Sequence, residues 1–381
     1  MGLLIDDLPM KQNGTNDEQT SEKKIAVNPV HILDCSLRDG GQLLETLFDS
    51  EEGRSPRFGH ENIKTIARKL SDSKIDIVEL GVINTTSQDR RAVSVFPTVG
   101  ELSQVMPQRR HDGQLFAGLI PEPDYPENLI PSRTPDCCDI IRVILRYSEI
   151  EKSLDFCRML SEKGYRTFLQ PMVTMRYTDE DLRKVFDAAN DMRAGAVYIV
   201  DSYGYMNTHH VNTLFEKYDA NLDESIPVGL HLHNNMNLAF GNAIDFAERR
   251  TSRHLLLDST VLGIGQGAGN LQTELIIDYM NKCRGGRYGY DSILEACEIV
   301  EKLWGNPLWG YSVTHLLGAI NNSAYKYAED FRKKYALSFV EIHKILSAIP
   351  EKYRHRYTPD FARELLSLNG LAHKLPQGKT G

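Results

Sequence analysis

The chain has 381 residues, of which 41% are hydrophobic, enough for one large domain of about 250 residues and a smaller region beside it. Its net charge of -8, with acidic and basic residues mixed along the chain, argues against a nucleic-acid-binding surface. Six scattered cysteines without a Cys-x-x-Cys pair indicate neither a zinc knuckle nor a disulfide framework. No secretory signal or apolar run of roughly 18 residues is present, so we expect a cytoplasmic protein with no membrane partner.

Residues 9 to 26 are polar and low in large apolar groups, so they cannot bury enough surface to offset chain entropy. They predict a flexible N-terminal tail over residues 1 to 28. After them, short apolar runs alternate with amphipathic stretches whose apolar residues recur at spacings of three and four. The apolar runs begin at Val30, Ile75, Leu115, Ile140, Thr167, Ala196, Val228 and Leu255. This alternation predicts a parallel sheet with right-handed crossovers. Eight units favour a closed (β/α)8 TIM barrel over residues 29 to 284, although their number alone also allows an open doubly wound sheet.

The strand signals cease after Gly285-Gly286, and residues 285 to 381 predict an all-helical C-terminal region. We predict its helices at Ser292 to Trp304, Val313 to Tyr335, Ser338 to Leu346 and Pro359 to Leu368. Such a region can extend the barrel core or form a dimerisation surface, and it can also act as a lid or a docking element. We expect a homo-oligomer.

The pair His231 and His233 ends the predicted strand that begins at Val228, and alternation along a strand directs both imidazoles to one face. Arg38 and Asp39 follow the first predicted strand. Because active sites of TIM barrels lie at the C-terminal ends of the strands, these residues are expected to meet there. Two histidines and one carboxylate predict a divalent-metal site. Histidines without a metal, and an Arg-Asp salt bridge or helix cap, are the alternatives.

Five motifs support this interpretation and occur in the order seen in one superfamily. They are Leu37-Arg-Asp-Gly-Gly-Gln42, Val78-Glu-Leu-Gly81, Asp201-Ser-Tyr-Gly204, His231-Leu-His-Asn-Asn235 and Gly263-Ile-Gly-Gln-Gly-Ala-Gly-Asn270. Over about residues 29 to 284, the chain resembles the pyruvate carboxyltransferase-like metallolyases. This superfamily includes HMG-CoA lyase, the isopropylmalate and homocitrate synthases and the 4-hydroxy-2-oxovalerate aldolases, all built on a (β/α)8 barrel with a divalent metal.

The resemblance implies four metal ligands, which are Asp39, His231, His233 and Asn270. It also implies that Arg38 is the catalytic cation, whose guanidinium stabilises the negative charge of an enolate. Glu79 corresponds to an acidic residue beside that arginine, either in proton transfer or as an ion pair that orients Arg38. Two imidazoles with oxygen ligands suit Mn or Mg best in our interpretation, and Co and Zn are also compatible.

Two features favour the aldolase branch. Leu169 to Tyr177 lacks the acidic pair of the synthases, and Asp201 to Gly204 is closer to the corresponding aldolase element. The leading interpretation is therefore a metal-dependent aldolase that cleaves or forms a 4-hydroxy-2-oxo acid through a metal-bound pyruvate enolate. Its small-molecule partners are then a 2-oxo acid and an aldehyde, and the resemblance alone implies an aldehyde dehydrogenase as a protein partner. The alternatives are an acyl-CoA-dependent Claisen-type synthase or HMG-CoA-lyase-like enzyme, and a non-catalytic barrel scaffold.

Gln42 departs from the aldolase pattern, in which a histidine takes the proton from the substrate hydroxyl. A glutamine orients a substrate or a water but cannot act as a base at neutral pH. We include Gln42 among the catalytic residues in that orienting role, which fits the glutamine of the lyase and synthase branches. The candidates to replace the base are His111, Tyr203, Tyr205 and Tyr311, each of which could equally have a structural role. The glycines between Gly263 and Asn270 predict a tight turn that presents Asn270.

Overall fold

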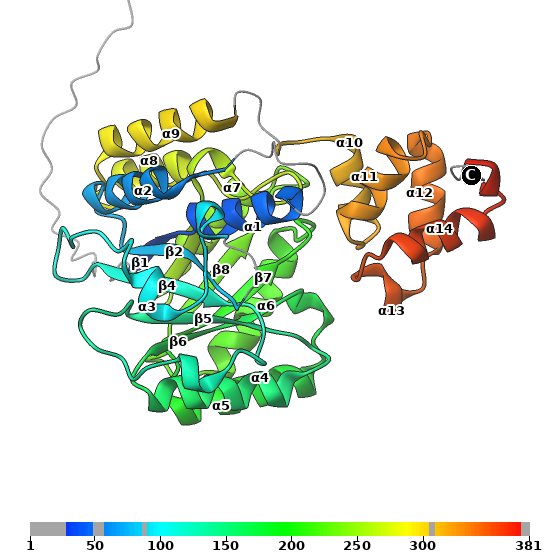
Figure 1. The fold of residues 1–381 in the computed structure, drawn as a ribbon. Helices are drawn as coiled ribbons and strands as arrows, with labels where there is room; N and C mark the ends of the chain where they lie inside the picture. Colours follow the sequence, from blue (N-terminus) through cyan, green and yellow to red (C-terminus); the bar gives the residue numbers. More distant parts are fainter. Residues whose placement is uncertain (1–27, 49–56, 86–89, 305–308, 375–381) are drawn as a thin grey trace, which may run out of the picture.

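The computed structural model describes residues 28–48, 57–85, 90–304 and 309–374, so the predicted tail over residues 1–28 lies almost wholly outside the described residues. The strands of this part of the chain form one parallel sheet in the order β1-β9-β8-β7-β6-β5-β4-β2-β3. An additional pairing of β1 with β2 closes eight of them into a barrel (Figure 1). The predicted (β/α)8 TIM barrel with a helical C-terminal extension is confirmed.

All eight predicted apolar runs are strands of the barrel. Their bounds are β1 Val30–Asp34, β2 Ile77–Ile83, β4 Leu115–Ile120, β5 Ile140–Leu145, β6 Arg166–Pro171, β7 Ala196–Asp201, β8 Val228–Leu232 and β9 Leu255–Ser259. These strands are buried on both faces, which explains why they appear in the sequence as continuous apolar runs. The further strand β3, Val95–Phe96, pairs with β2 and is too short to leave a pattern.

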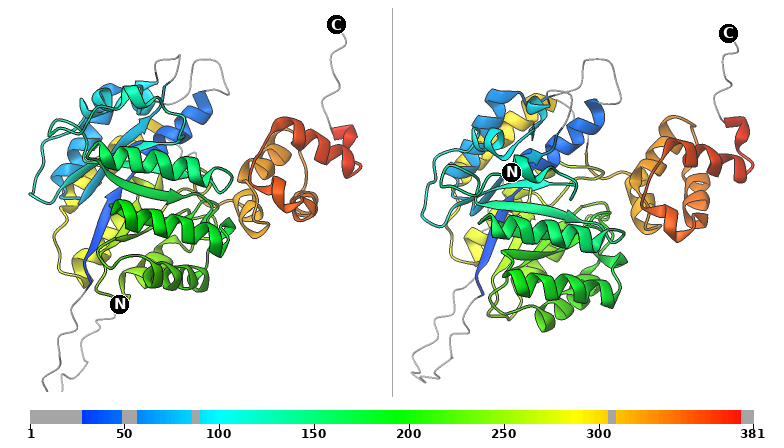
Figure 2. Two further views of the ribbon diagram at one scale, coloured as in Figure 1. Left: turned by 90° about the horizontal axis from the view of Figure 1, so that it is seen from below. Right: turned by 60° about the horizontal axis from the view of Figure 1, so that its bottom comes forward.

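Helices cover the outside of the barrel, as the two views of Figure 2 show. They are α1 Ser36–Phe48, α2 His60–Asp72, α3 Val99–Ser103, α4 Ile150–Glu162, α5 Asp179–Met192, α6 Thr208–Asn221, α7 Ala239–Ala247 and α8 Thr273–Cys283. The 3-10 turns are η1 Arg91–Val93, η2 Glu127–Leu129, η3 Thr174–Arg176, η4 Val261–Gly263 and η5 Ala372–Lys374. Local chemistry sets several boundaries: α5 begins at a capping box in which Thr178 and Asp181 satisfy each other's backbone N–H groups.

The C-terminal helices divide between two hydrophobic cores. Helix α9, Tyr290–Trp304, buries Ile293 and Val300 in the core of the barrel. Helices α10 Val313–Ile320, α11 Tyr325–Lys333, α12 Phe339–Ala348, α13 Glu351–Arg354 and α14 Pro359–Leu368 build a second core beside the barrel (Figure 1). The domain division that we predicted between residues 284 and 285 stays a prediction, and we place α9 with the barrel on the basis of its packing. In the described part of the chain, no helix is long and apolar enough to cross a membrane.

The helix predicted over Val313 to Tyr335 is wrong, because residues 321–324 interrupt it. Asn322 adopts a positive φ of 47°, and the Asn321 side chain donates to the carbonyl oxygen of Leu317 at 2.8 Å. Gly318 allows the turn, since an added Cβ would lie 3.0 Å from the Tyr325 Cα. Apolar residues continue at helical spacing across the break, so periodicity alone could not reveal it.

Asp139, at the N-terminal end of β5, connects three segments at the bottom of the barrel. Its carboxylate accepts hydrogen bonds from the Phe116 backbone N–H at 3.0 Å and from Arg109 and Arg133, each at 2.6 Å. Burial acts to raise the pKa of Asp139, but these donors outweigh it and lower the pKa below its usual value. The ionised carboxylate therefore contributes to the stability of the fold.

We expect Asp139→Asn to lower the free energy of unfolding at pH 7 by about 2 kcal/mol, because it removes the charge that both arginines bind. Since the folded pKa is depressed, this contribution is present above the unfolded pKa of about 3.9 and is lost as the pH falls through the folded pKa. Urea denaturation at several pH values measures both effects. Asp191→Asn, at an exposed position of α5, is the control. An equal loss in the two variants would contradict the prediction.

Candidate active site

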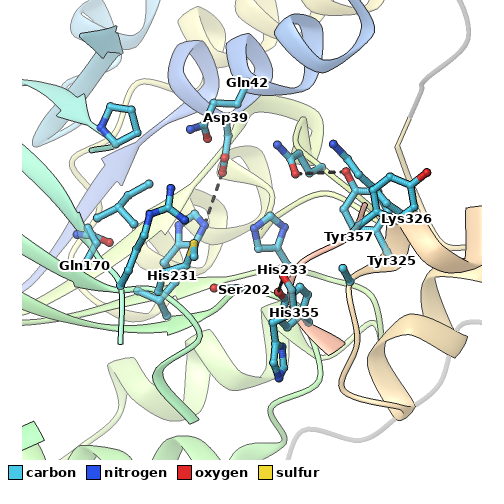
Figure 3. A pocket seen from close by; sticks show the side chains of 18 of the residues that line it. Asp39, Gln42, Gln170, Ser202, His231, His233, Tyr325, Lys326, His355 and Tyr357 are labelled. Atoms are coloured by element: carbon cyan, nitrogen blue, oxygen red, sulfur yellow. Dashed lines mark hydrogen bonds and ion pairs between the residues drawn. The ribbon is translucent and has the colours of Figure 1, made fainter. Parts of the chain in front are cut away.

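A cavity of about 450 Å³ lies at the C-terminal ends of the barrel strands, where the predicted site residues meet (Figure 3). Its volume is in the range of small-molecule sites. The barrel forms one side of the cavity, and the C-terminal helical region forms another through residues 324–326 and 355–357. The position agrees with the general location of active sites in TIM barrels.

Asp39 and His231 form the centre of the site. Asp39 lies in the first turn of α1, which follows β1 directly, and His231 lies near the end of β8. The His231 Nε2 is 3.6 Å from Asp39 Oδ2 (Figure 3). The other ring nitrogen of His231, Nδ1, is 2.8 Å from Asp258 Oδ2. Asp258 thus orients the imidazole so that Nε2 points to Asp39, an arrangement common behind metal-binding histidines.

His233 and Asn270 join this centre through backbone pairing. The two residues form an isolated antiparallel bridge, which places the glycine-rich loop beside the end of β8. The rings of His231 and His233 have centroids 5.2 Å apart, and both side chains line the cavity. Asn270 Nδ2 donates to Asp39 Oδ2 at 2.8 Å. Asp39, His231 and Asn270 therefore come together, and His233 lines the same cavity beside them. The His233 ring nitrogens are not in the described group of donor atoms that lie within 4.8 Å of one another.

The glycine-rich loop makes the tight turn that its sequence predicts. Gly269 has a φ of +83°, and a Cβ there would lie 2.0 Å from the carbonyl oxygen of Gly263. At Gly265, an added Cβ would lie 2.2 Å from Asn270 Nδ2. Glycine is therefore required at both positions, because any side chain would displace Asn270 or the turn that presents it.

Arg38 is almost fully buried and contacts the other predicted catalytic residues. Its Nε donates to Glu79 Oε2 at 2.9 Å, its Nη1 donates to Gln42 Oε1 at 3.2 Å, and the same Nη1 forms an ion pair with Asp39. Arg38, Gln42 and Asp39 line the cavity. Glu79 is fully buried behind Arg38, where it holds the guanidinium without reaching the cavity.

Arg142 and Asp258 complete the site and were not among the residues predicted from the sequence. The fully buried Arg142 donates from Nη1 to Glu79 Oε2 at 2.8 Å and from Nη2 to Asp258. A continuous series of contacts thus runs from Arg38 through Glu79, Arg142 and Asp258 to His231. The signal in the sequence was a charged residue inside an apolar strand, in Ile140-Ile-Arg-Val-Ile-Leu and in Leu255-Leu-Leu-Asp.

The donor atoms of Cys35, Asp39 and His231 lie within 4.8 Å of one another, close enough to share a cation. Burial raises the pKa of the Cys35 thiol well above its usual value, so the thiol is protonated and is a poor ligand. Burial acts to raise the pKa of Asp39, but Arg38 and the two histidines lower it overall. The carboxylate is therefore ionised, as cation binding requires.

Two further observations fit a bound cation. Burial lowers the pKa of His233 to about 4, so its imidazole is neutral at pH 7 and has a free lone pair. The buried Oδ1 of Asn270 has no hydrogen-bond partner among the described residues. An unsatisfied buried acceptor is costly, and a cation would satisfy it. Nitrogen and oxygen donors of this kind suit a divalent metal.

Of the four residues considered as substitutes for the missing base, Tyr203 alone lines the cavity. Its hydroxyl donates to the backbone carbonyl of His355 at 3.0 Å, and burial raises its pKa, so it is a neutral donor. Tyr311 is 55% exposed, and His111 lies in the turn before β4, at the opposite end of the barrel. Tyr205 does not line the cavity either. The proposal that His111, Tyr205 or Tyr311 replaces the base is therefore wrong.

Comparisons with known proteins give the family and the fold to which the chain is similar. Residues 144–301 match the HMGL-like family. The chain has an HMGL-like domain. The 4-hydroxy-2-oxovalerate aldolase of Geobacillus genomosp. 3 is 26% identical to the chain over 287 residues, which are 73% of this chain and 79% of that protein.

Solved structures of other proteins have a fold similar to that of this chain. The N-terminal domain of a protein from Bacteroides vulgatus superimposes with a TM-score of 0.65 at 21% identity and covers 82% of this chain and 99% of that one. The HMG-CoA lyase from Brucella melitensis superimposes on this chain with a TM-score of 0.56 at 18% identity. The superposition covers 73% of this chain and 100% of the lyase. Each likeness supports the (β/α)8 barrel.

We expect Arg142→Met to lower the free energy of unfolding by about 3 to 5 kcal/mol, because it leaves Glu79 and Asp258 as buried carboxylates without their shared cation. Arg146→Met is a matched control, since the exposed pair of Arg146 with Glu122 is worth less than about 1 kcal/mol. Chemical denaturation of both variants measures the difference. Similar losses in the two proteins would show that the buried charges are not coupled.

Proposed function

We propose that this protein is a divalent-metal-dependent aldolase that cleaves, or forms in reverse, a 4-hydroxy-2-oxo acid by way of a pyruvate enolate. The observation that carries the proposal is the convergence of Asp39, His231, His233 and Asn270 beside the buried guanidinium of Arg38. The similarity to curated 4-hydroxy-2-oxovalerate aldolases supports the same reaction class. A 2-oxo acid and an aldehyde are then the small molecules that occupy the cavity.

Asp39, His231, His233 and Asn270 are the residues that would hold the cation. When bound, a divalent cation supplies a Lewis acid for the keto and carboxylate oxygens of a 2-oxo acid, and Mn or Mg suits this donor set. Asp258 keeps the Nε2 of His231 directed at this position. Gly265 and Gly269 keep the Asn270 amide in place.

Arg38 stabilises the negative charge that develops when the carbon-carbon bond breaks. Its guanidinium is held at the cavity wall by Glu79 and Asp39, so it needs little rearrangement during the reaction. Glu79 binds both Arg38 and Arg142 through Oε2 and is fully buried outside the cavity lining, which supports a positioning role over proton transfer. Gln42 accepts from Arg38 at the cavity edge and orients the substrate or a water.

The first test is exchange of the pyruvate methyl protons for deuterium, followed by NMR. We expect exchange with added Mn or Mg, the metal being removed before spectra are recorded, and none after chelation or in Asp39→Asn. Such exchange reports enolate formation without any aldehyde. Absence of exchange with every divalent metal would overturn the proposal, and exchange that requires an added acyl-CoA would favour the Claisen-type synthase or the HMG-CoA-lyase-like enzyme instead.

We expect Arg38→Met to lower the exchange rate at least about 100-fold, because the developing enolate charge loses its preorganised donors. Metal content, measured on the same preparation by elemental analysis, should stay close to that of the wild type. Arg38→Lys should recover part of the rate, since it restores a charge without the planar guanidinium. A wild-type rate in Arg38→Met would remove Arg38 from the catalytic residues.

A further inference from the structure

The cavity has two chemically different sides. Asp39, His231 and Arg38 belong to the barrel side, whereas Tyr325, Lys326 and Tyr357 come from the C-terminal helical region and lie together across the cavity (Figure 3). Under the proposed function the 2-oxo acid occupies the barrel side. The aldehyde half of the substrate then extends toward the C-terminal helical region.

The positive charges that line the cavity differ in how they are neutralised. Arg38 forms an ion pair with Glu79, and Arg146 forms one with Glu122. Among the residues that the structure describes, neither Lys326 nor Arg356 forms an ion pair, although both line the cavity. The C-terminal side of the cavity therefore carries positive charge that no carboxylate within ion-pair distance compensates.

The carboxylates nearest to Lys326 along α11 are already engaged elsewhere. Glu329 is bound by Lys333 at 3.1 Å, and Asp330 is bound by Lys334 at 2.8 Å. Asp330 also accepts a hydrogen bond from the Tyr357 hydroxyl. Burial lowers the pKa of the Lys326 ammonium, although Glu329 and Asp330 act in the opposite direction. This half-buried cation is thus short of solvation, which an anionic ligand would restore.

Lys326 is held at a defined place, because the start of α11 is fixed on two sides. The Ala324 backbone N–H donates to the carbonyl oxygen of Arg354 at 2.8 Å. The Tyr325 hydroxyl donates to Gln266 Oε1 at 3.2 Å, which ties α11 to the glycine-rich loop of the barrel. The break between α10 and α11 places these residues at the cavity, so the backbone of Lys326 is fixed where its side chain lines the cavity.

We propose that Lys326, supported by Arg356 from the same helical region, binds an anionic group, a carboxylate or a phosphate, carried by the aldehyde half of the substrate. This inference rests on the proposed function and specifies its substrate class. The carboxylate of the 2-oxo acid does not account for Lys326, because that carboxylate belongs with the metal ligands and Arg38 across the cavity. An anionic aldehyde satisfies the uncompensated charge and fills the C-terminal side of the cavity.

The test is aldol addition of pyruvate to three aldehydes that differ in charge: glyceraldehyde 3-phosphate, succinic semialdehyde and neutral glyceraldehyde. The wild type should prefer one of the two anionic aldehydes by kcat/KM, and the preferred one identifies phosphate or carboxylate as the recognised group. In Lys326→Gln, the ratio of kcat/KM for the preferred anionic aldehyde to that for glyceraldehyde should fall at least about tenfold, the worth of one charge-assisted hydrogen bond.

Lys326→Arg should recover much of the preference for the anionic aldehyde, because it restores the charge. Lys344→Gln, at an exposed position of α12, is the control and should leave the ratio as in the wild type. Equal losses for charged and neutral aldehydes in Lys326→Gln would overturn the inference, and so would a wild type that accepts no anionic aldehyde. Deuterium exchange into pyruvate, measured on every variant, distinguishes these outcomes from a failure of the proposed function itself.

Discussion

The arrangement of the site depends on one fully buried cation, Arg142, held between two buried carboxylates. Glu79 on one side orients Arg38, and Asp258 on the other side orients His231. Burying three charged groups is costly unless each is paired, and here each carboxylate is shared between two cationic or imidazole partners. The guanidinium of Arg38 and the imidazole of His231 are therefore fixed by the same central residue. Arg38 follows β1 and His231 lies in β8, and these two strands are separated in the sheet by β9.

This buried network also explains why the geometry of a TIM barrel alone is insufficient to orient the site residues. Strand ends bring Asp39 and His231 near each other, but a histidine can rotate and an arginine has many rotamers. Asp258 binds Nδ1 of His231, which fixes the orientation of the ring so that Nε2 points to Asp39. Preorganisation of this kind reduces the rearrangement needed when charge develops during the reaction.

The C-terminal helices contribute to the site as well as to the fold. They have their own hydrophobic core, yet Tyr325 and Tyr203 connect them by hydrogen bonds to the barrel around the cavity. The barrel supplies the residues that fit a cation and an enolate, and the helical region supplies a wall with uncompensated positive charge. Under the proposed function, the barrel therefore determines the reaction type and the helical region determines the choice of aldehyde.

The sequence by itself determined the barrel and most of the residues at its centre. Buried parallel strands must be apolar runs, and the strand-end rule then brings Arg38, Asp39, His231 and His233 together. The roles of Arg142 and Asp258 needed the tertiary structure, because a charged residue in an apolar strand does not reveal its partner. The tertiary structure was also needed to find the break between α10 and α11. Asn322 creates this break through its positive φ, and Gly318 allows Tyr325 to approach closely. Only that packing places Lys326 at the cavity, since helical periodicity continues unchanged through the break and local sequence carries no record of which distant surfaces meet.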